Sequence, residues 1–433
     1  MSDSFHEPEW FREGIRHIWL PYTQMQNSPL PQAVKAVQGS RIILEDGREL
    51  IDGVASWWTA CHGYNHPHIK EAVAAQLDKM PHVMLAGLSN EPAFTLATRL
   101  AALTPGDLNR VFISESGSVS VEIALKLAVQ YWLNRGRPER QKIIAFKNGY
   151  HGDTIGTMAI GDSENIMHSP FAGLMHHQQI LDIPADEKTR QDVELFLEYN
   201  AGECAAVVLE PLVQGAGGMI FHDTETVKFI NDTCKKHDLL LILDEIMVGF
   251  GRLGSMFACQ QADVVPDILT LSKSLTGGTM ALAATVASDR IFEAFLSDDI
   301  EDCFMHGPTY TGNALACAAA NASLDLFETE PRLEQVQNIA AKLKAELVPC
   351  RSIKGVVDVR TMGALGVVEL DDMGDVDDMY WIRKKFVEEG CWVRPFGNIV
   401  YLMPPFVISD EELSTLTDTV VKIVGEWSDR KPS

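Results

Sequence analysis

The pattern of apolar and polar residues changes near residue 65 and again near residue 330. Before residue 65 the apolar runs are short, and RIILEDGRELID predicts a hairpin that turns at Asp46-Gly47. From there to about residue 330, helical periodicity alternates with strand-like runs. The last hundred residues predict a helix, strand-like runs and a closing helix, which is typical of a smaller α+β domain.

Three strand-like segments in the middle of the chain indicate the fold class. Residues 205–211 (AAVVLEP) and 239–245 (LLLILDE) are near-continuous apolar runs separated by a helix-like segment, as in parallel strands covered on both faces. A third segment spans residues 267–273 (DILTLSK). We therefore expect an α/β protein with a mainly parallel central sheet in a large domain, plus a smaller α+β domain.

The expected domains follow from these changes in pattern. Residues 1–64 form an N-terminal segment that packs with the small domain, residues 65–328 form the large domain, and residues 329–433 form the C-terminal small domain. Within the large domain, SVSVEIALKLAVQYW predicts a long amphipathic helix. One face of this helix carries Val121, Leu125, Ala128 and Trp132.

Composition excludes several classes of partner. The 433 residues are 46% apolar and carry a net charge of −24, so neither a nucleic acid nor an anionic membrane is an expected partner. No apolar run approaches the ~18 residues of a membrane span. The eight cysteines are scattered without a C-x-x-C pair, and the first residues lack the apolar core of a secretory signal. We expect a cytoplasmic protein with reduced cysteines.

Two glycine- or histidine-rich stretches resemble binding motifs without matching them. VQGAGGMIF has Ile220 where a dinucleotide fingerprint needs glycine, so a glycine-rich turn is the better interpretation. CHGYNHPH matches no zinc spacing, and we expect no metal. The tandem Trp57-Trp58 fits either a core position or the wall of an apolar pocket.

The chemistry-bearing residues lie at the carboxyl ends of the three central strands, where ligands bind in parallel sheets: Glu210, Asp244 and Lys273. A lysine amine forms Schiff bases with carbonyl groups, and a carboxylate can keep a pyridine nitrogen protonated. Pyridoxal phosphate (PLP) needs both groups. Each residue by itself is more often a helix cap, a salt-bridge partner or a solvated side chain.

Further residues fit the same cofactor. SESGSVSVE offers backbone N–H groups at a helix start for a phosphate, with Gly117 and Ser118 at the point of approach. GPTYTGN adds the hydroxyl of Thr309, and NGYHGD adds the ring of Tyr150 for stacking. Together these features, in compatible order along the chain, predict a PLP site.

Longer blocks carry a resemblance to a known family. LLLILDEIMVGFGRLG followed by PDILTLSKSLTGG, together with NGYHGDT and HGPTYTGNALACAAA, is similar to the signature blocks of class III (ω-type) aminotransferases, which have PLP fold type I. The likeness covers nearly the whole chain. It implies a PLP-dependent transaminase that works in two half-reactions, and a homodimer with shared active sites.

The resemblance also implies roles for individual residues. Lys273 would hold PLP as a Schiff base and carry the proton, and Asp244 would pair with the pyridine nitrogen. Contacts to the rest of the cofactor would come from Gly117, Ser118, Tyr150, Glu210, Pro308 and Thr309, the last from the partner subunit. The substrate pocket would include Tyr22, Trp57, Trp58, Tyr150, Gly307, Arg394 and Tyr401, with Tyr22 also catalytic.

Residues 15–25, 52–67 and 392–406, together with Pro308, are most similar to one branch of this family. That branch aminates 8-amino-7-oxononanoate to 7,8-diaminononanoate in biotin biosynthesis, with S-adenosylmethionine or, in some members, lysine as amino donor. A long aliphatic acid needs an apolar channel and a planar cation, which Trp57 and Arg394 can supply. The alternatives are another ω-amino-acid or ornithine-type aminotransferase, an aminomutase, and a non-catalytic nucleotide-binding or scaffold protein.

Overall fold

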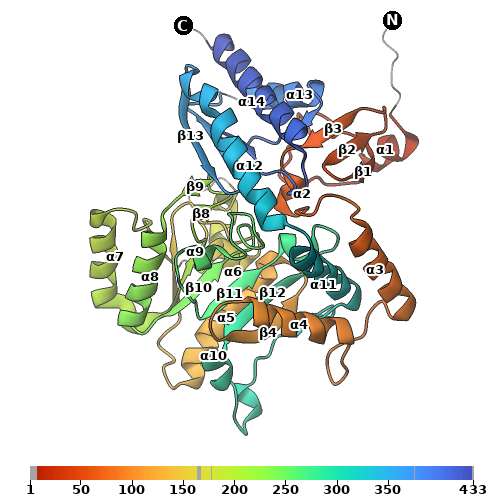
Figure 1. Ribbon diagram of the computed structural model, residues 1–433. Coiled ribbons are helices and arrows are strands. Elements are labelled where there is room, and N and C mark those ends of the chain that lie inside the picture. The colour runs from red at the N-terminus through yellow and green to blue at the C-terminus, as the bar shows by residue number, and fades with distance from the viewer. Residues whose placement is uncertain (1–6, 163–166, 177, 375, 432–433) are drawn as a thin grey trace, which may run out of the picture. The chain divides into compact units, whose positions relative to one another are not determined.

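The computed structural model describes residues 7–162, 167–176, 178–374 and 376–431 (Figure 1). The chain divides into two compact units, one formed by Met1–His66 with Glu334–Ser433 and the other by Pro67–Leu333. The N-terminal segment pairs with the C-terminal part through a parallel bridge between β3 (Glu49–Asp52) and β15 (Cys391–Trp392). The three domain boundaries expected from the sequence stay a prediction.

The Pro67–Leu333 unit is built on a seven-stranded sheet. Its strands, in spatial order, are β4 (Leu108–Ser114), β12 (Ala283–Ser288), β11 (Ile268–Leu271), β10 (Leu240–Asp244), β7 (Cys204–Leu209), β5 (Lys142–Phe146) and β6 (Gln179–Leu181). The central strands β7, β10 and β11 pair in parallel, and β12 runs antiparallel to both of its neighbours, β11 and β4. Every residue of these three strands is buried, which explains their unbroken apolar sequences and confirms the α/β prediction.

Helices and one small hairpin complete this unit. The helices are α3 (Pro67–Lys79), α4 (Glu91–Leu103), α5 (Gly117–Asn134), α6 (Ile155–Ala159), α7 (Glu187–Asn200), α8 (Thr224–Lys236), α9 (Ala258–Gln261), α10 (Asp289–Glu293) and α11 (Ala314–Thr329), with 3-10 turns η1 (Ser169–Leu174), η2 (Ala201–Glu203), η3 (Lys273–Thr276) and η4 (Ile300–Asp302). β8 (Val213–Gln214) and β9 (Ile220–Phe221) form the hairpin, so VQGAGGMIF is a turn, as predicted.

Helix α5 is buried more completely than its sequence suggested. The four residues expected on its apolar face are buried, but so are Ile123, Leu127 and Tyr131 on other sides. The helix packs against β7, β11 and β12, so the sheet covers one side of it. At its start, Ser116 Oγ accepts a hydrogen bond from the Val119 N–H at 3.3 Å, which caps the helix.

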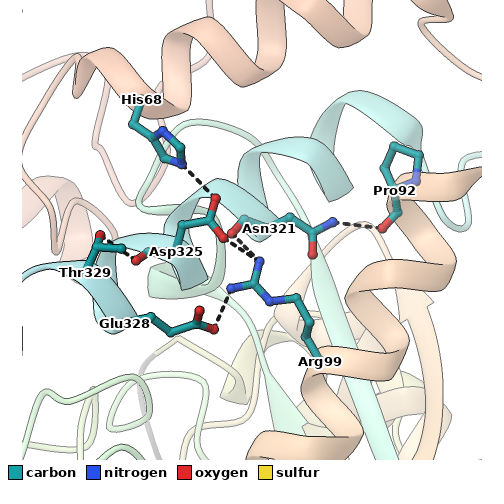
Figure 2. Close-up of polar contacts among 7 residues, drawn as sticks. All are labelled: His68, Pro92, Arg99, Asn321, Asp325, Glu328 and Thr329. Carbon is teal, nitrogen blue, oxygen red and sulfur yellow. Dashed lines mark hydrogen bonds and ion pairs between the residues drawn. The ribbon is translucent and has the colours of Figure 1, made fainter.

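A polar network joins α3, α4 and α11 (Figure 2). Asp325 of α11 accepts from His68 Nε2 of α3 at 2.7 Å and lies 2.8 Å from the Arg99 guanidinium of α4. Arg99 also reaches Glu328 at 2.7 Å and the Asn321 carbonyl at 2.7 Å. His68, from the histidine-rich stretch, therefore helps to hold three helices together.

The other unit contains two small sheets and five helices in its described residues. One sheet has the order β1 (Val34–Gln38), β2 (Arg41–Leu44), β3 and β15, and the other has β13 (Val356–Met362), β14 (Leu365–Leu370) and β16 (Ile399–Leu402). The helices are α1 (Glu9–Gly14), α2 (Ala55–Trp58), α12 (Arg332–Glu346), α13 (Val376–Glu388) and α14 (Asp410–Arg430), with the 3-10 turn η5 (Val348–Ser352).

The predicted hairpin in this unit is confirmed, since β2 and β3 pair antiparallel and Gly47 has a φ of 86° at the turn. Helix α13 was not predicted from the sequence. Within the part of the chain that the structure describes, no helix combines the length and the apolar character needed to cross a bilayer.

Candidate active site

The carboxyl ends of β7, β10 and β11 bring three ionisable side chains to one edge of the large sheet. Asp244 is the last residue of β10, Glu210 follows β7, and Lys273 begins η3 just after β11. Because β10 pairs in parallel with both other strands, their ends lie side by side. The charges of Asp244 and Glu210 both act on Lys273, which places all three in one electrostatic group.

Asp244 forms a buried pair with His151. Its Oδ2 lies 2.8 Å from His151 Nδ1, its Oδ1 accepts from the Ile246 N–H at 3.1 Å, and the two side chains are 5% and 1% exposed. Burial alone would lower the pKa of His151, but the hydrogen bond and charge of Asp244, with that of Glu210, raise it. The carboxylate of Asp244 is therefore held in place by two hydrogen-bond partners, and its charge favours the protonated form of His151.

Lys273 has a lowered pKa because burial disfavours its charged form, an effect that the charges of Asp244 and Glu210 partly offset. A lowered pKa increases the fraction of neutral amine, the form that attacks carbonyls and accepts protons. Lys273 also has a φ of 48°, a left-handed conformation that is costly for a residue with a side chain. Such strain gathers at functional positions.

Glu210 fixes the loops around this group. Its Oε1 accepts from the Tyr150 N–H at 3.0 Å and its Oε2 from the Gly215 N–H at 2.9 Å. Burial raises its pKa to about 7, with His151 acting in the opposite direction. Tyr150 is thereby anchored through its backbone, and its ring stacks on His168 with centroids 5.9 Å apart.

The N-terminus of α5 forms a tight cradle with the loop before α6. Ser118 Oγ accepts from the Asp153 N–H at 3.3 Å, and a Cβ on Gly152 would lie 2.1 Å from that oxygen. A Cβ on Gly117 would meet Ile246, two residues beyond Asp244, at 3.1 Å. An 18-residue helix that begins with such close backbone approaches is suited to bind a phosphate.

These residues fit PLP. The donor set contains an amine of lowered pKa at Lys273, a fixed carboxylate at Asp244 and a helix N-terminus at Gly117, which match the aldehyde, ring nitrogen and phosphate of the cofactor. The segment with Gly307, Pro308 and Thr309 precedes α11 in the same unit, and the Thr309 carbonyl lies 3.1 Å from His82 Nε2. Thr309 itself is exposed.

The predicted substrate residues of the other unit form a second group. The Arg394 guanidinium carbon lies 4.8 Å from the centre of the Trp57 ring, and Tyr22 meets the same indole edge-on at 6.0 Å. Trp58 Nε1 donates to the Tyr401 hydroxyl at 3.1 Å. The structure therefore brings all five of these predicted residues into contacting pairs, and Trp58 is the more deeply buried of the tandem tryptophans.

Burial shifts the pKa values of the side chains in this second group. It lowers the pKa of Arg394, with Tyr401 and Tyr22 opposing the effect, and raises the pKa of Tyr401 to about 12. Arg394 and Tyr22 also line a cavity of about 720 Å³ together with Arg383 of α13. Burial and the charge of Arg394 lower the pKa of Arg383 to about 10. The lining of this cavity mixes apolar side chains with charged ones of both signs, and within it the neighbouring Arg383 and Arg394 are suited to bind an organic carboxylate.

Three site residues were missed from the sequence: Asp52, His151 and Arg383. His151 stands inside NGYHGD, next to Tyr150, so its position in a predicted loop was the available signal. Arg383 lies on the unpredicted helix α13. Asp52 ends β3 and contacts the turn that holds both tryptophans.

Comparisons with known proteins agree with this chemistry. Residues 22–424 match the family model for class-III aminotransferases. A curated adenosylmethionine-8-amino-7-oxononanoate aminotransferase from Buchnera aphidicola is 42% identical, over 94% of this chain and 95% of that protein. The crystal structure of an enzyme of the same name from Methanocaldococcus jannaschii matches with a TM-score of 0.91 and 36% identity, covering 96% of this chain and 98% of that one. A PLP-bound amine transaminase from an uncultivated Pseudomonas species matches with a TM-score of 0.86 and 30% identity, over 95% and 98% of the two chains.

Proposed function

The chain belongs to the class III aminotransferase family, and we propose that it aminates 8-amino-7-oxononanoate to 7,8-diaminononanoate, a step of biotin biosynthesis. The observation that carries the chemistry is the lowered pKa of Lys273, which follows the carboxyl end of β11 and lies within the charges of Asp244 and Glu210. The observation that supports the substrate is the pairing of Arg394 with the Trp57 ring, since Arg394 also lines a cavity of mixed apolar and charged side chains. The names of the relatives point to the same reaction.

The cofactor of this proposal is PLP, which when bound supplies an electron sink that stabilises negative charge on the carbon losing a proton. Asp244, fixed by His151 and the Ile246 N–H, presents a carboxylate to the ring nitrogen. The N–H groups at the start of α5 and the hydroxyl of Ser118 would hold the phosphate. Tyr150, Glu210 and Pro308 would make further contacts to the cofactor.

Lys273 moves the proton. Its Nζ, partly neutral because burial lowers its pKa, takes a proton from the substrate carbon that bears nitrogen and later returns a proton on the other side of the transferred amine. The reaction runs in two halves, so the amino donor leaves as a ketone before the keto acid binds. The resemblance to the family also assigns Tyr22 a part in catalysis.

Substrate recognition is assigned to the Arg394 group. The guanidinium of Arg394 forms a bidentate pair with the carboxylate of the keto acid, while Trp57, Trp58 and Tyr22 contact its aliphatic chain. The resemblance to the family also assigns Gly307 to the substrate, and the Tyr401 hydroxyl holds the Trp58 indole by accepting a hydrogen bond from its Nε1. We propose S-adenosylmethionine as the donor, since the relatives carry it in their names.

The proposal includes a homodimer in the cytoplasm. Thr309 is exposed and would contact the phosphate held by the partner subunit. Eight cysteines without a disulfide are consistent with a reducing compartment.

Mass spectrometry of the products tests the proposal. The purified enzyme with PLP is incubated with 8-amino-7-oxononanoate and either S-adenosylmethionine, lysine, ornithine or an ω-amino acid. The proposal predicts 7,8-diaminononanoate with S-adenosylmethionine and none with Lys273→Ala. Product with lysine alone would correct the donor, and transfer from ornithine to other keto acids without this product would refute the substrate.

A further inference from the structure

The two tryptophans of the substrate group lie in a left-handed turn. The φ angles of Ala55, Ser56, Trp57 and Trp58 are 46°, 51°, 58° and 72°. Hydrogen bonds from Trp58 N–H to the Val54 carbonyl at 2.9 Å and from Thr59 N–H to the Ala55 carbonyl at 2.8 Å close the turn. A complete left-handed helical turn built from residues with side chains is disfavoured by contacts between Cβ and the backbone, so other interactions must hold it.

The carboxylate of Asp52 makes those interactions. Its Oδ1 accepts from the Val54 N–H at 2.8 Å, and its Oδ2 accepts from the Ser56 N–H at 3.1 Å and from the Tyr64 hydroxyl at 2.5 Å. Asp52 is completely buried at the end of β3, where its own N–H donates to the Ser40 carbonyl at 2.8 Å. The sheet therefore fixes the carboxylate, and the carboxylate fixes the entry to the turn.

Tyr64 remains a hydrogen-bond donor in this arrangement. Burial and the charge of Asp52 raise the pKa of Tyr64 far above its usual range, so its hydroxyl keeps the proton that it donates. Burial also raises the pKa of Asp52, while the hydrogen bonds from Tyr64 and the backbone oppose the effect. Three donors around one carboxylate are what a buried acceptor requires.

The turn decides where the two indoles lie. In the left-handed conformation Trp57 stacks under Arg394, and Trp58 reaches Tyr401. β3 and β15 are parallel neighbours with Asp52 opposite Trp392, so the turn and Arg394 leave the sheet at the same end. A right-handed turn would project both side chains in other directions and separate these pairs.

We propose that Asp52, supported by Tyr64, is a positioning residue for the keto-acid substrate: it holds the left-handed turn that presents Trp57 and Trp58 beside Arg394. The inference rests on the proposed function, because it assigns the arrangement to recognition of a long aliphatic carboxylate. Asp52 acts through the turn and touches no reacting atom. It therefore affects KM for the keto acid and leaves the cofactor group of the other unit intact.

The first test compares Asp52→Asn and Tyr64→Phe with the wild-type holoenzyme. Losing hydrogen bonds to a buried carboxylate raises KM for 8-amino-7-oxononanoate by about tenfold in Asp52→Asn and less in Tyr64→Phe. The affinity for PLP and the visible absorbance of the bound cofactor stay at wild-type values, while the near-ultraviolet circular dichroism of the tryptophans changes. A second change, Ser56→Gly, in the Asp52→Asn background restores KM, because glycine adopts the left-handed conformation without strain.

Glu346→Gln is the matched control. The carboxylate of Glu346 lies in the same unit and accepts from the hydroxyls of Ser414 and Thr417 at 2.9 and 2.6 Å, so its loss weakens the unit without touching the turn. This variant keeps the wild-type KM even if its melting temperature falls.

Each outcome separates the inference from the proposed function. If the wild-type enzyme does not aminate the keto acid, the proposed function fails. If the wild type does so and Asp52→Asn folds with a KM within about twofold of it, only the inference is overturned. If Asp52→Asn does not fold, Tyr64→Phe decides: an unchanged KM and unchanged near-ultraviolet spectrum overturn the inference, and a change in both supports it.

Discussion

Replacing His151 with phenylalanine tests the buried pair at the candidate active site. The pair joins His151 Nδ1 and Asp244 Oδ2 at 2.8 Å, with side chains 1% and 5% exposed. The replacement leaves Asp244 with a hydrogen bond from the Ile246 N–H and with the charges of Glu210 and Lys273 acting on it or near it. Removing one partner of a buried ion pair costs about 3–5 kcal/mol of unfolding free energy, and we expect a loss near the lower end.

The chain contains a matched exposed pair. His68 Nε2 lies 2.7 Å from Asp325 Oδ2, almost the same separation, but these side chains are 46% and 40% exposed (Figure 2). His68→Phe should therefore cost under about 1 kcal/mol, because water screens the interaction in both states. Urea unfolding of both variants and the wild type, without added PLP, gives the two free-energy differences side by side.

The pH dependence of the unfolding free energy gives a second, independent test of the His151–Asp244 pair. The pKa of His151 is raised in the folded protein by Asp244, above the ordinary value of 6.5. A raised pKa in the folded state adds stability that is complete below the unfolded value and is lost as pH rises through the folded value. The difference between wild type and His151→Phe should therefore be largest below about pH 6.5 and shrink at higher pH.

Equal losses in the two variants would refute this reasoning, since distance alone would then determine the contribution of the pair. A loss below about 1 kcal/mol for His151→Phe would also refute it, because the removal of one partner from a buried ion pair should cost more than that. A difference that grows with rising pH would show that the pair is not charged as described.

Three further predictions concern the surrounding residues. Glu210→Gln should flatten the pH dependence of the unfolding free energy, as urea unfolding from pH 4 to 8 would show. Burial raises the pKa of Glu210 from 4.5 to about 7, so the wild type should lose about 3 kcal/mol of stability as the pH rises between these values. Arg394→Lys should raise KM for the keto acid by about tenfold and Arg394→Ala by about a hundredfold, as steady-state kinetics would show, because lysine lacks the bidentate fork. Gly152→Ala should weaken PLP binding in a fluorescence titration, because the added Cβ would lie 2.1 Å from Ser118 Oγ and the φ of 130° disfavours side chains. The control variant Gly173→Ala has open space around the added Cβ and should bind PLP normally.

The strands that carry the cofactor group were predictable because buried parallel strands leave long apolar runs. The predicted ranges 239–245 and 267–273 contain β10 and β11, and the range 205–211 covers β7 except for its first residue, Cys204. The ends of these strands bring Glu210, Asp244 and Lys273 together. The resemblance to class III aminotransferases then indicated which other residues belong to the same cofactor site. The match to the family model confirms that resemblance. The roles of the individual residues stay predictions.

Other features depend on contacts that no local pattern contains. Helix α13 escaped prediction because VDDMYWIRKKFVE mixes apolar and charged residues, and only Ile382, Phe386 and Val387 of it are buried. The stacking of Arg394 on Trp57 depends on the pairing of β3 with β15, strands that are far apart in sequence. The left-handed turn has no glycine to signal it, since the buried carboxylate of Asp52 compensates for the strain.

The central claim is that Lys273 and its neighbours perform transamination on this particular diamine and keto acid. A single half-reaction tests it directly: 7,8-diaminononanoate alone is added to the PLP-bound enzyme while the visible absorbance of the cofactor is followed, with ornithine and an ω-amino acid in parallel. The account predicts that only the diamine changes the absorbance and that 8-amino-7-oxononanoate appears in equal amount, with no release by Lys273→Ala. A change with ornithine and none with the diamine would contradict the assigned substrate, and full activity in Lys273→Ala would contradict the assigned chemistry.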